Sequence, residues 1–438
     1  MIELDLHWSI VAATIFLMIF LFLGIGLPVA VALGAVGIVS TFLFLHGKGM
    51  GIIGYVAWEM SNSFILTSVP LFVFMGQLLQ HSGMSRRLYE GSSALLGRTK
   101  GGLLQTNIIA CAIFATISGS SVATAATVGY MAIPEMERRG YGRRITMGSL
   151  AAGGTLGILI PPSTAMIIYG VMVEQSIGQL FIAGILPGIL LSAMFMALIW
   201  VWVAIYPENA PKFEPMPWRQ RIAKIFLMWP IVMLMLVVLV GIYAGVMTAS
   251  ESAAVGAGIA LVLAIVYGQM TWRVLWDSLL DTVRATSFLL FIMIGASIVS
   301  GTLGLMRIPE QLTAWVISLN TSPVLVLAIV YVMYIILGCF IDTVSMVVLT
   351  LPVVYPVLMK LGYDPIWFGV VLVVIVEIAL IHPPVGLNLF TIHGIRPKQP
   401  MSDVVWGSVP FLITMIVGLV ILTIFPGIAT WLPSTMKS

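Results

Sequence analysis

Two short polar stretches interrupt long apolar runs of this sequence, and both carry oxygen-bearing side chains. The first, ATISGSSVATA (115–125), has hydroxyl side chains on both sides of a glycine. The second, GCFIDTVS (338–345), has a glycine followed by one carboxylate and two hydroxyl side chains. Oxygen atoms are the ligands that hard cations such as Na⁺ prefer. Irregular backbone at membrane depth is costly unless it lines a cavity or is covered by protein. The candidate binding residues are Ser118, Gly119, Ser120 and Ser121 in the first stretch and Gly338, Asp342, Thr343 and Ser345 in the second.

Each polar stretch is followed by an apolar run with a proline pair, GGTLGILIPPS (153–163) and EIALIHPPVGLN (377–388). Glycines and prolines weaken a helix, so we expect both runs to unwind here. Freed carbonyls can ligate a cation, and half-helix N-termini attract anionic groups. Hydroxyls with few charges favour Na⁺ and a carboxylate substrate over a transition metal, which would need Cys, His or Met clusters. The candidates in these runs are Gly153, Thr155, Gly157, Pro161 and Pro162, and then Glu377, Pro383, Pro384 and Asn388.

Several of these polar residues have a structural alternative. An acid at membrane depth is usually functional, but Asp342 could instead cap the following helix. Glu377 could bind an ion or pair structurally, and the role of Asn388 is equally open. We expect His382 to be packed and hydrogen-bonded, and Glu251 to serve as a helix N-terminal cap.

The composition is that of a membrane protein. Of 438 residues 60% are hydrophobic and 8% charged, and the mean hydropathy is +1.11. Apolar runs of 18 or more residues recur along the chain, each long enough to cross a bilayer core of roughly 30 Å. The N-terminal MIELDLHW lacks Lys and Arg, which favours a retained first helix over a cleaved signal peptide. Cys111 and Cys339 fall in apolar runs, so we expect buried thiols without a disulfide.

Landmarks of the first half recur in the second, which predicts an internal duplication. The offset is 222 residues for four of them: Pro161-Pro162 and Pro383-Pro384, Gly140-Tyr141 and Gly362-Tyr363, Pro134 and Pro356, and Met84 and Met306. The predicted organisation is a first repeat (1–206), a linker (207–222) and a second repeat (223–438).

Each repeat is expected to contain five transmembrane helices and one re-entrant helical hairpin. The hairpins are 102–135 and 323–358, with arms of about 14–16 residues, or roughly 21–24 Å of helix, which is short for a full crossing. The alternative is two further spans in each half. Segments 50–61 and 270–285 are amphipathic and are interpreted as interfacial helices. The predicted spans are 8–24, 27–46, 62–82, 144–171, 179–206, 223–244, 249–267, 286–304, 366–394 and 406–432.

The number of spans in each half and the placement of Lys and Arg in the loops predict inverted repeats. Five crossings per half place the second repeat upside down relative to the first. If the N-terminus is outside, 16 of the 20 basic residues fall on the inner side, as the positive-inside rule requires. Both termini would then face outward, with the first hairpin entering from the cytoplasm and the second from outside. If each hairpin is instead counted as two spans, the number of crossings per half is still odd, so the predicted orientation of the two repeats does not change. The inner residues are Arg86, Arg87, Arg98, Lys100, Arg138, Arg139, Arg143, Arg144, Lys212, Arg219, Arg221, Lys224, Arg273, Arg284, Arg396 and Lys398, against Lys48, Arg307, Lys360 and Lys437 outside.

Four segments resemble the large membrane subunit of the tripartite ATP-independent periplasmic (TRAP) transporters, within the ion transporter superfamily. They are ISGSSVATAATVGYMAIPEM (117–136), GGTLGILIPPS (153–163), IDTVSMVVLTLPVVYP (341–356) and HPPVGLNLF (382–390). The resemblance implies an elevator mechanism, with a transport domain that carries both hairpins past a static scaffold. It also implies two Na⁺ sites, one near Ser118, Ser121 and the first break, the other near Asp342, Thr343 and the break after Glu377.

The function that the resemblance implies is the membrane permease subunit of a sodium-driven importer in the bacterial inner membrane, with both termini periplasmic. The implied partners are a small four-helix membrane subunit, separate because this chain begins at the first span, and a periplasmic substrate-binding protein. The substrate would be an organic acid, such as a C4-dicarboxylate, sialic acid or another sugar acid. No cofactor beyond the coupling ion and no nucleic acid is expected.

Two rival functions follow from the same features. One is a self-sufficient Na⁺/dicarboxylate carrier of the same superfamily. The other is a membrane-embedded enzyme with a Ser or Asp nucleophile, which would need a His or Lys base that the first hairpin lacks. There is no GxxxxGK[ST] motif and no HExxH motif, so ATP drive by this chain is unsupported and we expect a transporter rather than an enzyme.

Overall fold

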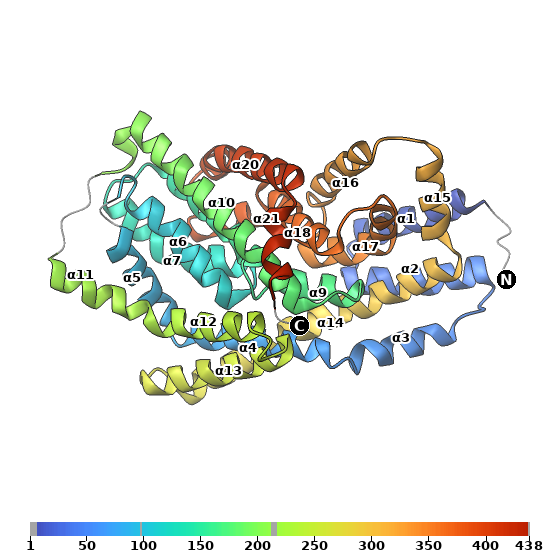
Figure 1. Cartoon of the computed structure of the whole chain (residues 1–438), viewed down its shortest axis with the longest axis horizontal. Coiled ribbons are helices and arrows are strands. Elements are labelled where there is room, and N and C mark those ends of the chain that lie inside the picture. Colours follow the sequence, from blue (N-terminus) through green and yellow to red (C-terminus); the bar gives the residue numbers. More distant parts are fainter. Residues whose placement is uncertain (1–6, 97–98, 212–216, 437–438) are drawn as a thin grey trace.

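A computed structural model describes residues 7–96, 99–211 and 217–436, and within these ranges the regular structure is helical throughout. Figure 1 shows an elongated arrangement, with α6 and α7 towards one end and α16 and α17 towards the other. The helices of the first half are α1 (Trp8–Gly24), α2 (Val29–Leu45), α3 (Gly51–Ser61), η1 (Ile65–Thr67), α4 (Ser68–His81), α5 (Met84–Leu96), α6 (Leu103–Ser118), α7 (Ser121–Arg138), α8 (Arg143–Leu159), α9 (Thr164–Met172), α10 (Ile177–Ile205) and η2 (Pro207–Asn209).

The second half begins after the linker and follows a similar order. Its helices are α11 (Trp218–Ile225), η3 (Phe226–Met228), α12 (Trp229–Tyr243), α13 (Ala249–Val266), α14 (Trp272–Leu305), α15 (Ile308–Ser318), α16 (Pro323–Leu337), α17 (Thr343–Lys360), α18 (Pro365–Ile381), α19 (Leu387–Ile395), α20 (Met401–Ile424) and α21 (Gly427–Ser434).

The helix bounds repeat at the offset found in the sequence. Helices α17 and α18 begin and end 222 residues after α7 and α8. The proline pairs also correspond, since each lies directly after α8 or α18 and each has a cis peptide bond between its prolines. The repeat boundaries and the inversion across the membrane stay predictions, and Arg98, Lys212 and Lys437 of the charge argument lie outside the described residues.

Within the described residues, seven helical segments are long and apolar enough to cross a membrane, or eight if α3 and α4, which are bent by 53°, form one span. Five shorter apolar helices accompany them: α1, α2, α6, α16 and α18. The chain is therefore all-helical and polytopic, as predicted. The seven segments are Arg143–Met172, Ile177–Ile205, Trp218–Tyr243, Ala249–Val266, Trp272–Leu305, Thr343–Lys360 and Met401–Ile424.

Two details of the predicted elements are wrong. Residues 270–285 do not form a separate interfacial helix, because α14 runs unbroken from Trp272 to Leu305; no glycine or proline interrupts it before Gly295. The second arm of each hairpin is also longer than expected: α7 and α17 each have 18 residues, about 27 Å of helix. The first arms, α6 with 16 residues and α16 with 15, have the expected length. Re-entrance of the two hairpins stays a prediction.

The helices pack into two groups. In the first, α14 packs against α2 and α4, and α13 packs against α4 and α12. In the second, α8 packs against α6, α7 and α20, and α18 packs against α8, α16 and α20. Helix α13 begins with a capping box between Thr248 and Glu251, which confirms the predicted cap. Cys111 and Cys339 are both buried and free, which is also as expected.

The two halves interlock through the short helices after the proline pairs. Helix α9 follows α8 in sequence but packs mainly on α17 of the other half. Helix α19 likewise packs on α7. Tyr169 of α9 donates a 2.5 Å hydrogen bond to the carbonyl of Pro365, and its ring packs edge-on against Tyr355. Each hairpin is thus covered by a helix from the opposite half.

Candidate functional site

The turn of the first hairpin is a compact group of hydroxyls around a left-handed glycine. Helix α6 ends at Ser118, Gly119 has φ +56°, and Ser120 caps the N-terminus of α7 through Ala123 N at 3.4 Å. The Ser118 hydroxyl donates to the Ser120 carbonyl at 3.1 Å and shares a 2.6 Å hydrogen bond with the hydroxyl of Thr124. Only a residue without a side chain takes this backbone conformation easily, so Gly119 allows the sharp reversal between the arms.

The break after α8 is shorter than predicted and begins later. Gly153 and Gly157 lie inside the continuous helix α8, and the helix stops only before the proline pair. The expectation that the glycines unwind it is wrong. Gly153 instead lets the Cys111 side chain approach, since an added Cβ would lie 3.0 Å from its sulfur. Small residues in membrane helices commonly serve such close packing, whereas each proline lacks the N–H that a helix needs.

The first turn and the first break are joined directly. The Ser121 hydroxyl donates to the carbonyl of Thr155 at 3.2 Å, and the Thr164 hydroxyl donates to the carbonyl of Gly119 at 2.9 Å. A Cβ on Gly157 would lie 2.6 Å from the Ser120 carbonyl oxygen, so only glycine permits this approach. The structure therefore brings the serines of the turn together with α8 and the start of α9.

Proline and threonine residues complete this first cluster. An added Cβ on Gly119 would lie 3.1 Å from the carbonyl oxygen of Pro162, so the turn also faces the proline pair that begins at Pro161. Thr155 directs its hydroxyl to the Ala152 carbonyl at 2.6 Å. Thr164 was not predicted, although its place directly after the Pro-Pro-Ser break was a signal that could have identified it.

The turn of the second hairpin carries a carboxylate that is bonded within its own helix. Asp342 caps α17, because its Oδ2 accepts hydrogen bonds from Val344 N at 3.1 Å and Ser345 N at 3.2 Å. Its Oδ1 accepts a 2.5 Å bond from the Ser345 hydroxyl. Thr343 is the first residue of α17. The structure thus shows the capping role that the sequence left open, and the ion-binding role of Asp342 stays a prediction.

The second turn meets the second break by side-chain packing. A Cβ added to Gly338 would overlap that of Ala379, the residue equivalent to Gly157. The Nδ1 of His382 lies 3.7 Å from the Cys339 sulfur, consistent with a packed histidine. The break follows at the pair Pro383-Pro384.

Two buried polar groups lie near this second break. Glu377 is 0% exposed on α18, and neither carboxylate oxygen has a hydrogen bond of good geometry, although the backbone of Leu159 approaches it. Asn388 is also 0% exposed, and its amide donates to the Ala151 carbonyl on α8 at 3.2 Å while its own oxygen has no partner. Unpaired polar groups at this depth are costly, so they mark a place where a ligand could complete the bonding.

A multidentate metal centre of the usual protein type is not present among the described side chains, since no three His, Cys, Asp or Glu residues gather there. A bound cation in this region would therefore depend on hydroxyls, backbone carbonyls and single carboxylates.

Comparison with known proteins places this arrangement in a family. The sequence model of "Tripartite ATP-independent periplasmic transporter, DctM component" matches residues 16–428. The chain belongs to this family. It is 36% identical over 405 residues to the "C4-dicarboxylate TRAP transporter large permease protein DctM" of Pseudomonas aeruginosa, covering 92% of this chain and 94% of that protein. It is 30% identical to the "Sialic acid TRAP transporter permease protein SiaT" of Haemophilus influenzae, covering 86% of this chain and 61% of that one.

A solved structure shares the fold of this TRAP permease. The crystal structure of the Alcanivorax borkumensis YdaH transporter, described as having an unusual topology, aligns with a TM-score of 0.61 over 95% of this chain and 98% of that one. The sequences are 16% identical, so the likeness concerns the fold alone.

Proposed function

We propose that this chain is the membrane-spanning pathway of a sodium-driven importer of an organic acid. The observation that carries the proposal is the docking of the first hairpin turn onto the broken helix, through Ser121 to Thr155 and Thr164 to Gly119. This docking places hydroxyls and backbone carbonyls at a helix break, which is the arrangement by which transporters coordinate ions and substrates near the membrane midplane.

The second half would supply the negative charge of a second sodium site. Asp342 is in the turn that packs on α18 through Gly338 and Ala379, and the unpartnered Glu377 is buried on α18 itself. A carboxylate substrate would bind between the two halves, where the N-termini of α9 and α19 follow the proline pairs and favour anionic groups.

Movement in this proposal is of the elevator type. The packing supports it, because both hairpins pack on the group around α8 and α18: α6 and α7 pack on α8, and α16 and α17 pack on α18, while α17 also packs on α14. The group around α4 and α14 would be the static scaffold, and the group around α8 and α18 would be the moving domain. The protein would work in the bacterial inner membrane, both termini in the periplasm, with a small membrane subunit and a periplasmic substrate-binding protein.

The test is uptake into proteoliposomes that contain the chain and its small membrane subunit, with the substrate-binding protein added to the outside. C4-dicarboxylates and sialic acid are the first substrates to compare, because the related permeases are named for them. We expect uptake that requires an inward Na⁺ gradient and both partners. Equal uptake by the chain alone would instead support a self-sufficient carrier, and uptake without Na⁺ would remove the proposed coupling.

A further inference from the structure

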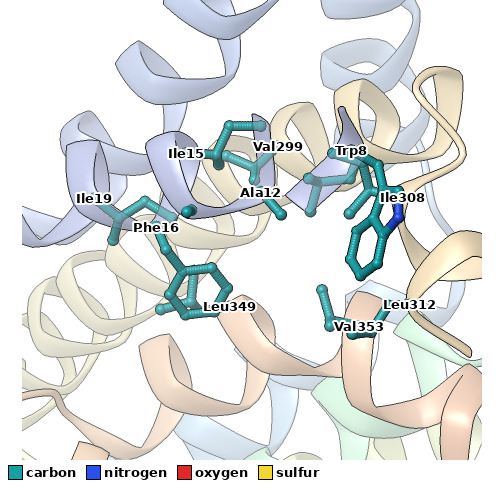
Figure 2. Close-up of a pocket in the computed structure, with 12 residues that line it drawn as sticks. Trp8, Ala12, Ile15, Phe16, Ile19, Val299, Ile308, Leu312, Leu349 and Val353 are labelled. Carbon is teal, nitrogen blue, oxygen red and sulfur yellow. The ribbon is translucent and has the colours of Figure 1, made fainter. Parts of the chain in front are cut away.

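An apolar crevice of about 200 Å³ separates the second hairpin from the first helix of the chain. Helices α1, α14, α15 and α17 form its walls, and its lining side chains are hydrophobic. Figure 2 shows side chains of α1 facing those of α17 across the open space. Residues from the different walls include Ala12, Phe16, Val299, Leu312, Leu349 and Val353.

The crevice reaches the outer surface of α1. Ala13 lines it and is exposed, while Ala12 and Phe16 line it and are half-buried. On the same helix Leu17 is 70% exposed and Leu21 is 57% exposed. Because the chain is a membrane protein, the medium around such a surface is lipid hydrocarbon.

The size and chemistry of the crevice select its occupant. Apolar cavities of about 150 Å³ in other proteins stay dry and accept apolar guests, so water is a poor filling here. An empty space would leave the lining atoms without dispersion contacts. Within a bilayer there is no hydrophobic driving force, and occupancy depends on shape and close packing. The acyl chains of the surrounding lipids are narrow and apolar, as the crevice is, and they are the solvent of this surface.

One end of the crevice carries residues that suit a lipid headgroup. Trp8 lines this end, and its ring lies 6.4 Å from that of Trp315, a pair typical of a membrane interface. Arg307 precedes the lining residue Ile308 and is exposed, and its Nε lies 3.7 Å from a carboxylate oxygen of Glu310. We propose that a phospholipid binds here, with an acyl chain in the crevice and its phosphate at the Trp8 end near Arg307.

This site lies between the two helix groups, because α17 belongs to the second hairpin and α1 packs with α2. A bound acyl chain would therefore lie between the hairpin arm and α1, beside the place where α17 packs on α14, without contacting the proposed ion sites. The binding itself does not depend on the substrate or the coupling ion, so its test measures lipid contact and not uptake.

The experiment uses photo-crosslinking of the full-length chain in cell membranes. Cells that express it are fed a fatty acid with a diazirine in the chain, which enters their phospholipids, and cross-linked peptides are mapped by mass spectrometry after illumination. We expect labels on Phe16 of α1 and on Leu349 and Val353 of α17, besides those on the outer face at Leu17. Ala12→Phe should fill the crevice and lower the α17 labels several-fold, while leaving the outer-face labels unchanged.

The matched control is Leu17→Phe, which adds the same ring to the exposed face of the same helix and should leave the α17 labels intact. Val353→Phe fills the crevice from the opposite wall. If Ala12→Phe does not fold, Val353→Phe takes its place, and the expected result is a lower lipid label on Phe16. Absence of lipid label on α17 in the unchanged chain would overturn the proposal. So would α17 labels that persist in a folded, filled variant, or a protein cross-linked there in place of lipid.

Discussion

The two hairpin turns occupy equivalent positions, yet they are attached to their helix breaks by different means. The first turn is tied by hydroxyl-to-carbonyl hydrogen bonds, Ser121 to Thr155 and Thr164 to Gly119. The second turn directs its carboxylate, Asp342, back onto its own helix. It meets the following span through Gly338 and Ala379.

The difference also appears in the position of the glycine and of the charge. The glycine that allows the turn and the span to approach differs between the halves. In the first half it is Gly157 on the span, which faces the Ser120 backbone of the turn. In the second half it is Gly338 on the turn, which faces the Ala379 methyl group of the span. The first cluster is neutral and its hydroxyls are already bonded, whereas the second contains Glu377 without a hydrogen-bond partner. The first turn is thus held by bonds that are already formed, whereas the second half leaves a buried carboxyl group without a hydrogen-bond partner.

Among the substitutions proposed here, alanine in place of Gly157 or Gly338 should reduce uptake most strongly. Gly157→Ala places a methyl against the Ser120 backbone, and overpacking of this kind costs about 1–3 kcal/mol, roughly a 5- to 150-fold loss of the docked form. We expect Gly338→Ala to impair uptake as well, but Ala379→Gly in the same chain should restore it, because the obstacle there is a side chain. Uptake in proteoliposomes measures both.

Gly258→Ala is the control for these variants, since an added Cβ there meets nothing within 4 Å. Full uptake by Gly157→Ala, or failure of Ala379→Gly to improve Gly338→Ala, would show that the two glycines do not set the approach of the turns.

Glu377→Gln should change the response of the protein to Na⁺ more than its stability. Glutamine has nearly the same size and shape as glutamate, so the melting temperature of the Na⁺-free protein should change little. The same variant should show a smaller stabilisation by added Na⁺, because a cation no longer gains a charged ligand. Thermal unfolding with and without Na⁺ measures both effects. An undiminished Na⁺ shift would exclude Glu377 from the second site.

Two substitutions of Asp342 separate its capping role from an ionic one. Asparagine keeps an N-cap acceptor and removes the charge, whereas alanine removes both, with loss of a cap worth about 1 kcal/mol. We expect Asp342→Asn to fold normally but to require more Na⁺ for half-maximal uptake, and Asp342→Ala to be less stable in addition. Ser118→Ala provides the comparison in the first half and should also weaken Na⁺ dependence, through loss of the bond to Thr124. Wild-type Na⁺ dependence in Asp342→Asn would leave the residue as a cap only.

The smallest effect is expected at Thr164. Thr164→Val removes the hydrogen bond to the Gly119 carbonyl, a loss of about 0.5–1.5 kcal/mol, and should lower uptake a few-fold. Thr391→Val serves as its control, because the Thr391 hydroxyl bonds only to the Leu387 carbonyl of its own helix at 2.8 Å. Equal uptake by the two variants would mean that this bond does not hold the turn in place.

The sequence predicted the features that depend on local rules. Glycine and proline fix where chains turn and helices stop, so both hairpin turns, both proline breaks and the 222-residue offset were visible in it. It did not predict features that depend on neighbours. Whether Gly153 and Gly157 loosen a helix or allow close packing is decided by what lies opposite them, here Cys111 and the Ser120 backbone. Thr164 was missed for the same reason, since its partner Gly119 is 45 residues away.

The crossing of the short helices between halves has a consequence for how the protein is made. Helix α9 packs mainly on α17, which begins only at Thr343. Helix α7 packs on α19, which begins at Leu387. At a synthesis rate of about 5–20 residues per second, α9 emerges roughly ten to forty seconds before its partner. During that interval the nascent first half exposes two unmatched surfaces in the membrane, and its final packing is completed only when the last third of the chain arrives.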